Sequence, residues 1–560
     1  MKNKIIYLFI MLVGVLACSD DFSEVPAYGA LSDEALQNAQ GVDLLLIGAY
    51  SLLDGNSNTG GSDYARAADG WWTDVMSDDA HKGSTNSDQP DLYAFEVMNW
   101  QTSNGYIDAR WVGLFAGVNR ANAVIDLIGK LDPSEGDFSA QLAQARFLRG
   151  HFNFELQVMW GNVPYISDVN FADVEFNQPN PGPIWDKIID DMSYAETNLP
   201  ETQDEVGRPT SWAAKAYLGK VYLHKGDTGP ALAKLTEVIN GNHRFGLLTE
   251  YADNFRLAGD NSDESLLAIQ FTADDGLSFN GNIGGTLNFP GPINCCGFYN
   301  PTQDLLNAFQ TDANGLPLLD TYNQTDVTSD YGINSDEPFT PFAGNLDPRA
   351  DYTVGRRGIE FNGYGVHPGK DWQRANFSDL SGPYTPKKNV YQASETANQG
   401  AGGWGEQRSG VNYHIIRFAD VLLMGAEAAA EENQLELATD WVNEVRRRAK
   451  NSTYVSNDGT NPAANYKIEE YPATFPNQEY AIKAVRFERR LELGMEGKRL
   501  FDIRRWGATD IMNAYFVNEG RTITSFAGLP APYDPHFDLS PIPLRAIDLS
   551  GGILTQNPGY

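Results

Sequence analysis

The stretch that decides the fold is residues 485–507, VRFERRLELGMEGKRLFDIRRWG. Its apolar residues recur at helical spacing, which predicts an amphipathic helix that breaks at Gly497 and continues into a basic end. Glutamates and arginines stand three or four residues apart, a spacing that favours ion pairs within a helix and with its neighbours. We therefore interpret these charges as a buried or half-buried network that locks the last helix to a scaffold, rather than as an acid–base or phosphate-binding cluster.

Helical periodicity also fills the first half of the chain and the residues just before this stretch. Predicted helices cover residues 42–53, 107–131, 138–160, 184–199, 210–225, 418–432 and 437–449. Short turns such as Gly226-Asp227 join these helices in pairs, and small residues lie on the faces that pack together, as in tetratricopeptide repeats. The sequence thus predicts a mainly α fold, built on a curved scaffold of tetratricopeptide-like helical pairs.

Between residues 251 and 410 helical periodicity nearly disappears, and Gly, Pro, Asn, Asp and aromatic residues dominate. A loop region of this length in a compact protein is usually functional, so we expect a ligand-binding insertion that contains a few short strands. The predicted organisation is a signal peptide (1–17), a lipidated N-terminus and tether (18–38), a helical scaffold (39–250), the loop-rich insertion (251–410), C-terminal helices that close the scaffold (411–510) and a C-terminal extension (511–560).

The first residues have the pattern of a secretory signal: two lysines precede an apolar run, residues 5–15, that is too short to span a bilayer. The run ends in Val15-Leu16-Ala17-Cys18, which resembles the bacterial lipobox. We expect Cys18 to carry the lipid that anchors the chain. The acidic residues that follow it are similar to the surface-export signal of Bacteroidota lipoproteins, which predicts a surface-exposed position on the outer membrane.

The chain is strongly acidic, with 41 Lys and Arg against 74 Asp and Glu and a net charge of −33. This argues against nucleic acid as a partner, because binding to phosphates depends on cationic side chains. Aromatic residues make up 12% of an exported, acidic, Gly-rich chain, a composition that fits the stacking of sugar rings. Cys295 and Cys296 are adjacent, so they form either a strained vicinal disulfide or two free thiols. No spacing typical of metal ligands is present, and we expect no cofactor.

Several segments, in the expected order, resemble the SusD/RagB family of surface glycan-binding lipoproteins from Bacteroidota. They are residues 111–125 (WVGLFAGVNRANAVI), 146–165, 417–427 (RFADVLLMGAE), 442–449 (VNEVRRRA), the stretch 485–507, Pro541-Ile542-Pro543, and the ending Gln556-Asn557-Pro558-Gly559-Tyr560. The resemblance implies a tetratricopeptide-like scaffold with a loop-rich ligand face. It also implies a partner, a SusC-like TonB-dependent outer-membrane barrel over which the protein closes as a lid.

The first candidate ligand site is the early segment 62–82, SDYARAADGWWTDVMSDDAHK. One of two adjacent tryptophans on irregular backbone can lie in the core while the other is exposed as a stacking platform, with carboxylates beside it as acceptors for sugar hydroxyls. The predicted ligand-binding residues of this segment are Trp71, Trp72, Asp63, Asp74 and Asp78. The alternative is that both rings pack against the scaffold.

Further candidates lie in the insertion, each weighed against a packing role. Tyr299 follows the tight turn of the cysteine pair, and Arg356 and Trp372 come from the middle of the region. Trp404 stands between glycines on an expected loop tip. Asp320, Asp326 and Asp330 resemble a calcium loop, but their spacing matches no EF-hand, so we predict no metal.

The function predicted from the sequence is capture of a polysaccharide or oligosaccharide, most simply a neutral one given the acidic balance, and delivery to the transporter without catalysis. No nucleophile elbow, zinc-protease motif or Walker loop is present, and we assign no catalytic residue. Two alternatives stay open. One is a surface glycoside hydrolase with paired carboxylates. The other is an adaptor lipoprotein that binds protein in the concave groove of its helical repeats.

Overall fold

The computed structural model describes residues 36–55, 63–66, 69–169, 177–273, 281–289, 296–402 and 405–560. Of residues 63–64, 396–398, 401–402 and 405–407 it describes the backbone alone. The predicted signal peptide and Cys18 lie outside the described residues. No helix within the described ranges is both long enough and apolar enough to cross a bilayer.

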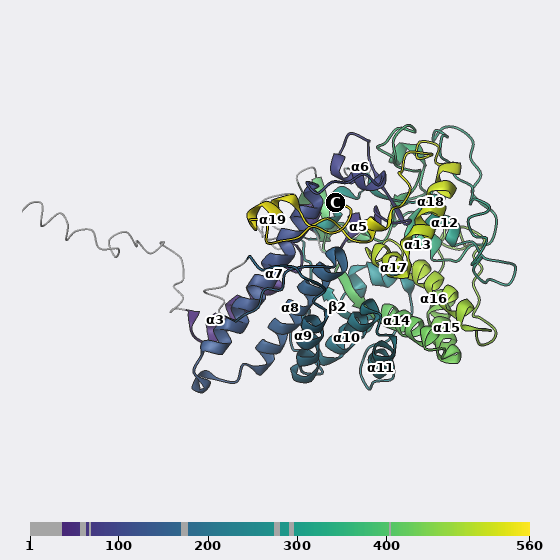
Figure 1. Ribbon diagram of the computed structural model, residues 1–560. Coiled ribbons are helices and arrows are strands. Elements are labelled where there is room, and N and C mark those ends of the chain that lie inside the picture. Colours follow the sequence, from purple (N-terminus) through teal and green to yellow (C-terminus); the bar gives the residue numbers. More distant parts are fainter. Residues whose placement is uncertain are drawn as a thin grey trace, which may run out of the picture.

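A row of antiparallel helices forms the scaffold, and each helix packs against the next (Figure 1). The row consists of α3 (Ala39–Tyr50), α7 (Gly105–Lys130), α8 (Ser139–Trp160), α9 (Trp185–Asn198), α10 (Ser211–Lys225), α11 (Thr228–Ile239), α14 (Phe418–Glu431), α15 (Leu435–Asn451) and α16 (Gln478–Leu493). The predicted mainly α fold of helical pairs is confirmed. The row also crosses the insertion, because α11 packs directly on α14 although 178 residues separate them along the chain.

Helix α10 shows how the sequence sets these pairs. It begins at Ser211, where the Thr210 hydroxyl accepts a hydrogen bond from the Ala213 N–H at 3.1 Å, and it ends at Gly226, whose φ of 91° suits glycine. Gly219 lies on its packing face, where a Cβ atom would approach Leu235 of α11 to 2.7 Å. The small residue therefore permits the close contact between the paired helices.

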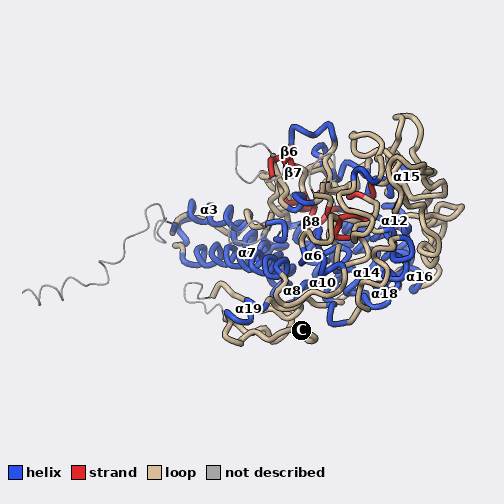
Figure 2. The backbone as a smooth tube through the Cα atoms, turned by 90° about the horizontal axis from the view of Figure 1, so that it is seen from above, coloured by secondary structure: helices blue, strands red, loops and turns tan. Residues whose placement is uncertain are grey.

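The insertion is dominated by loops, with short strands that join it to the scaffold (Figure 2). The strands pair as β1 (Ala80–Gly83) with β3 (Phe298–Pro301), β2 (Ser265–Ile269) with β8 (Tyr413–Arg417), β4 (Val354–Gly355) with β5 (Thr385–Pro386), and β6 (Gln399–Gly402) with β7 (Gly405–Ser409), all antiparallel. The short helices before and within it are α4 (Asp63–Arg66), α5 (Trp71–Asp74), α6 (Pro90–Glu96), α12 (Gln303–Ala308) and α13 (Ala350–Thr353). The β1–β3 pair brings the early segment onto the insertion, and β8 leads straight into α14.

The chain ends in α17 (Arg499–Trp506), α18 (Ala508–Thr522) and α19 (Leu544–Leu549). The break between α16 and α17 falls where the sequence predicts it. Gly497 has a φ of 69°, and a Cβ atom there would lie 2.2 Å from the carbonyl oxygen of Asp69. Glycine is required at this position, and the break thereby contacts the early segment.

The charged residues of α16 form a buried ion-pair network, as the sequence predicts. Glu492 pairs with Arg417 at 2.7 Å, with Arg349 at 3.0 Å and with Arg448. All four side chains are at most 4% exposed. The network also contains Glu264, Asp347, Lys388, Arg446, Glu488 and Glu496, which gives five cations and five carboxylates.

Charge balance is what makes this burial tolerable. Burial alone would raise the pKa of Glu492, yet Arg448, Arg417 and Arg349 hold it well below its usual range. Buried ion pairs contribute little net stability when complete, but removal of one partner leaves an uncompensated charge in a low-dielectric interior. The network thus binds β8, α15, α16 and the insertion to one another as an all-or-none arrangement.

We predict that Arg417→Met lowers the free energy of unfolding by about 3–5 kcal/mol, because it leaves three buried carboxylates short of a cation. The matched control is Arg447→Met on α15, whose exposed pair with Glu470 at 2.7 Å should contribute about 1 kcal/mol or less. Denaturant unfolding of both variants measures the difference. Equal losses would show that the network does not carry the fold.

A second buried site of opposite charges surrounds His81 on β1. Its Nδ1 lies 2.5 Å from Glu96 of α6, and its Nε2 lies 2.8 Å from Glu519 of α18. Burial would lower the pKa of His81, but the two carboxylates raise it to about 10. The imidazolium therefore links an early helix to the C-terminal helices at neutral pH.

This linkage predicts a pH dependence of stability. Because the folded-state pKa of His81 lies above the ordinary value of 6.5, its contribution is fully present below about pH 6.5 and is lost as the pH rises through about 10. We expect the free energy of unfolding of the natural protein to fall more steeply between pH 7 and 10 than that of His81→Gln. Urea unfolding across that range compares two proteins that differ only at this residue, and parallel pH profiles would contradict the assignment.

Candidate functional site

The tryptophan pair of the early segment lies in the core. Trp71 and Trp72 are both 0% exposed. Trp72 stacks on Phe95 with ring centroids 5.2 Å apart and donates its Nε1–H to the Ala65 carbonyl, whereas Trp71 meets Tyr299 edge-on at 5.8 Å. The expectation of an exposed platform here is wrong, because α6 covers one ring and β3 covers the other.

The carboxylates of the same segment contact the α16–α17 break. Asp74 Oδ2 accepts hydrogen bonds from the Tyr299 hydroxyl at 2.6 Å and from the Gly497 N–H at 3.0 Å, and burial raises the pKa of Asp74 to about 7. Asp78 pairs with Arg499 at 2.7 Å and with Arg490 at 3.2 Å. Asp74, Asp78 and Tyr299 are at most 1% exposed. The prediction that they are surface contacts for a ligand is therefore wrong. The side chain of Asp63 lies outside the described residues.

The predicted residues of the middle insertion also have structural partners. Arg356 is buried and forms a bidentate ion pair with Asp351 at 2.7 and 2.8 Å. The expectation that it donates to sugar hydroxyls is therefore wrong. Trp372 is half-buried and packs against Phe361 and His367 with centroids 5.4 and 4.7 Å apart. Trp404 lies outside the described residues. Of the described candidates, Trp372 alone keeps part of its ring accessible.

Two of the three acids that resembled a calcium loop form ion pairs with cationic side chains. Asp320 pairs with Lys483 at 2.6 Å and Asp326 with Arg521 at 2.5 Å. No group of three or more potential metal-ligating side chains occurs in the part of the chain that the structure describes. Cys296 is disulfide-bonded, and Cys18 and Cys295 fall outside the described residues.

A polar pocket does lie where the early segment, the insertion and the α16–α17 break meet. We call it the loop-face pocket, and its volume is about 60 Å³. It is lined by Asp69, Asn254, Phe255, Asn282, Lys388, Asn389, Tyr391, Ser409, Val411, Asn412, Tyr413, His414, Met495 and Glu496. The lining combines four amides, three hydroxyl-bearing side chains, two carboxylates, a lysine and three aromatic rings, a mixture typical of sites for hydroxyl-rich ligands.

Two acceptors of this pocket lack donors among the described residues. Asn254 Oδ1 and His414 Nδ1 are buried without a hydrogen-bond partner. Burial lowers the pKa of His414 to about 4, so its ring is neutral, and Nε2 lies 3.1 Å from the Asn254 carbonyl oxygen, to which it donates. Nδ1 is therefore an acceptor, and both acceptors remain without a donor among the described residues at the pocket wall.

The other pocket residues divide into fixed and available groups. Asp69 accepts from the Trp71 N–H at 3.4 Å and from the Asn282 amide at 3.3 Å, and burial raises the pKa of Asp69 to about 6. Glu496 is held by Arg417 and Lys388 at 2.9 and 2.8 Å. The half-buried Asn389 amide makes no hydrogen bond with another described residue. Asn389 is thus the amide of the pocket that remains open to a ligand.

Sequence reasoning missed Asn254, Asn389 and His414. Each stands alone in the sequence, and 160 residues separate the first from the last. The one available signal is the Asn412-Tyr413-His414 run, which places polar side chains at the start of a strand that leads into the ion-pair residue Arg417.

Two family models match the chain. One, described as the SusD family, matches residues 263–560, and the other, described as starch-binding associating with outer membrane, matches residues 27–223. The chain belongs to the SusD family. The resemblance of its segments to the SusD/RagB family is thereby confirmed.

Curated relatives cover most of the chain. The SusD-like protein P2 of Formosa agariphila is 28% identical over 83% of each chain, and a SusD-like protein of Bacteroides ovatus is 25% identical over 93% of this chain and 86% of that relative.

Solved SusD-family structures share the fold. A SusD superfamily protein from Bacteroides vulgatus gives a TM-score of 0.68 at 19% identity over 94% of this chain and all of that one. A laminarin binding SusD-like protein gives 0.65 at 21% identity over 93% of this chain and all of that one. Surface glycan-binding protein A from Bacteroides thetaiotaomicron in complex with laminarihexaose gives 0.64 at 18% identity over 93% and 99%.

For this SusD-family chain, the packing of the tryptophan pair predicts that Trp71→Ala lowers the free energy of unfolding by about 3–5 kcal/mol, the usual cost of removing a large ring from a core. The half-buried Trp372 provides the comparison, and Trp372→Ala should cost clearly less. Thermal and denaturant unfolding measure both. A Trp71→Ala protein as stable as the natural one would restore the surface-platform interpretation.

Proposed function

We propose that this protein binds a polysaccharide or oligosaccharide at the cell surface and passes it to a SusC-like TonB-dependent barrel, without being an enzyme. Membership of the SusD family supports the proposal, as do structural relatives whose titles describe laminarin and laminarihexaose binding. The observation that carries the binding mode is the loop-face pocket, whose unpaired acceptors fit sugar hydroxyls. Attachment through a lipid on Cys18 belongs to the same proposal.

The pocket favours binding over hydrolysis. A glycosidase needs two carboxyl groups that face each other across the scissile bond, one of them able to donate or accept a proton. The two carboxylates here are Asp69 and Glu496, and Glu496 is fixed in ion pairs that hold its pKa low against the effect of burial. Both oxygens of Glu496 accept hydrogen bonds from Arg417 and Lys388, so this carboxylate is not free to attack a sugar or to activate a water molecule.

The chemistry of the pocket also supports an uncharged glycan. The ionised Asp69 and the unpaired acceptors Asn254 Oδ1 and His414 Nδ1 attract O–H donors and disfavour an added carboxylate. Lys388, the cation of the pocket, is already paired with Glu496. A volume of about 60 Å³ takes one hydroxylated edge of a sugar ring, while the rest of a polymer continues outside the pocket.

Calorimetry and affinity electrophoresis against a glycan panel that includes laminarin and starch test the proposal. We predict that one neutral glycan binds and that Asn389→Ala weakens it roughly threefold to tenfold, the effect of one lost hydrogen bond. Asn240→Ala, an exposed asparagine at the end of α11, is the matched control and should bind normally.

Reducing ends of the glycan that accumulate with time would show hydrolysis and contradict the proposal that the protein only binds. If no glycan bound, and a peptide library instead bound along the helical row, the adaptor interpretation would replace it. Pull-down of the SusC-like barrel from intact cells with the natural chain tests the interaction needed for delivery. Comparison with Cys18→Ala tests attachment, and both measurements are separate from sugar binding.

A further inference from the structure

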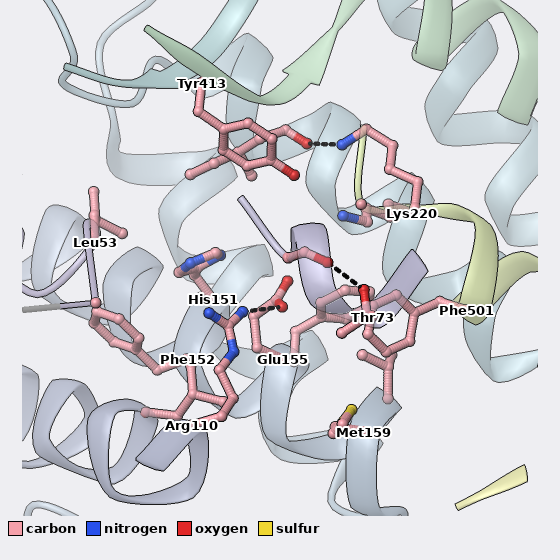
Figure 3. A pocket seen from close by; sticks show the side chains of 18 of the residues that line it. Leu53, Thr73, Arg110, His151, Phe152, Glu155, Met159, Lys220, Tyr413 and Phe501 are labelled. Carbon is pink, nitrogen blue, oxygen red and sulfur yellow. Dashed lines mark hydrogen bonds and ion pairs between the residues drawn. The ribbon is translucent and has the colours of Figure 1, made fainter. Parts of the chain in front are cut away.

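A second cavity, shown in Figure 3, shares Tyr413 with the loop-face pocket as a lining residue. It is enclosed by α7, α8 and α10 of the scaffold, by β8, and by the start of α17, and its volume is about 70 Å³. A buried site of roughly 10–15 Å³ holds one water molecule, so this cavity has space for a group of several heavy atoms. We call it the scaffold cavity.

The charged lining of the scaffold cavity is opposite in sign to the protein as a whole. It contains five cations, Arg66, Arg110, Lys220, Arg489 and Lys498, and three carboxylates, Glu155, Asp420 and Asp502. The complete chain carries a net charge of −33. Two histidines, His151 and His224, also line the cavity, and burial lowers the pKa of both, so they add no charge near neutral pH.

The three carboxylates are already engaged. Glu155 pairs with Arg110 at 3.0 Å, and Figure 3 shows this pair at the cavity wall. Asp420 and Asp502 both pair with Arg489, at 2.9 and 3.0 Å. They therefore offer little compensation to the remaining cations.

Lys220 has no ion-pair partner among the described residues, although Glu155 and Asp420 lie near enough to act on its charge. It makes no ion pair and no hydrogen bond with another described residue, and its ammonium lies over the rings of Phe154 and Tyr217 at 4.9 and 5.3 Å. Burial lowers the pKa of Lys220 to about 8, Lys498 acts in the same direction, and Glu155 and Asp420 oppose the shift. The half-buried side chain is still mainly protonated at neutral pH, which leaves a partly desolvated charge that an anion would compensate.

Lys498 faces the same space with donors to spare. Its ammonium donates to the carbonyl oxygens of Ile415 and His414 at 3.2 and 3.4 Å, and it forms no ion pair among the described residues. An ammonium group has three N–H donors, and carbonyl oxygens do not neutralise its charge. Two lysines from different elements, α10 and the α16–α17 break, thus approach one cavity without a carboxylate partner.

We propose that the scaffold cavity binds a small polyatomic anion, a carboxylate or sulfate group, between Lys220 and Lys498. Such a group supplies several acceptor oxygens for the unused N–H donors and compensates both charges in a low-dielectric site, where charge-assisted hydrogen bonds are strong. The inference does not rest on the proposed glycan binding, because it concerns a different cavity and a ligand of opposite character.

The test measures the thermal stability of the purified protein in sodium sulfate, acetate and glucuronate, each against sodium chloride at equal ionic strength. Sulfate stabilises most proteins by exclusion from their surface, so the readout is the difference between the natural chain and Lys220→Met. We expect a saturable rise in Tm with at least one of the three anions that is largely lost in Lys220→Met. The anion that gives the greatest rise distinguishes inorganic sulfate, a simple carboxylate and a sugar acid.

Lys225→Met is the matched control, since Lys225 lies on the same helix but is exposed and pairs with Asp227 at 2.6 Å, and it should keep the full rise. The rise should also diminish above about pH 8 as Lys220 loses its proton. If Lys220→Met does not fold, Lys498→Met and anomalous scattering from selenate soaked into crystals provide the same decision. Equal rises in the natural and variant proteins, or no saturable rise with any of the three anions together with no selenate in the cavity, would overturn the proposal.

Discussion

The carboxylate of Glu492 is shared by three arginines that come from β8, from α15 and from the insertion, and the rest of the structure depends on this contact. Each of those side chains would be costly to bury alone, so none can take its place until the others are present. The contact therefore couples parts of the chain that are far apart in sequence. It also explains why a region as rich in loops as the insertion has a defined position: its polar residues Arg349 and Lys388 are fixed by carboxylates of the scaffold side.

The same helix positions the groups that line the loop-face pocket. The α16–α17 break brings Gly497 against Asp69 and Asp74 of the early segment, while Arg490 holds Asp79 and Asp304 at 2.8 Å each. Arg417, on the other side, ends the strand that carries Tyr413 and His414. The loop-face pocket is thus assembled from three distant segments by charges that never reach solvent, and a side chain can govern the pocket without lining it.

The sequence was sufficient for the scaffold and insufficient for the pocket, and the difference has a physical cause. Helical periodicity is local, so it placed α8 and α10 within a residue of their ends, and the Glu and Arg spacing of 485–507 correctly indicated ion pairs. Whether Trp71 is exposed depends instead on what covers it, and the cover is β3, more than 220 residues away. The unpaired acceptors of Asn254 and His414 are likewise a property of the assembled fold, which no local pattern encodes.

Tyr413 lines both the loop-face pocket and the scaffold cavity; its hydroxyl donates to the Glu496 carbonyl oxygen at 3.0 Å, and Lys498 lies over its ring at 5.6 Å. A single side chain that lines both volumes would link ligand binding in one to ligand binding in the other. Any occupant that displaces the ring on one side changes the affinity on the other, and linkage requires the effect to be equal in both directions. The Tyr413 ring, which contacts Glu496 and Lys498 of the α16–α17 break, would therefore couple ligand binding in the loop-face pocket to ligand binding in the scaffold cavity.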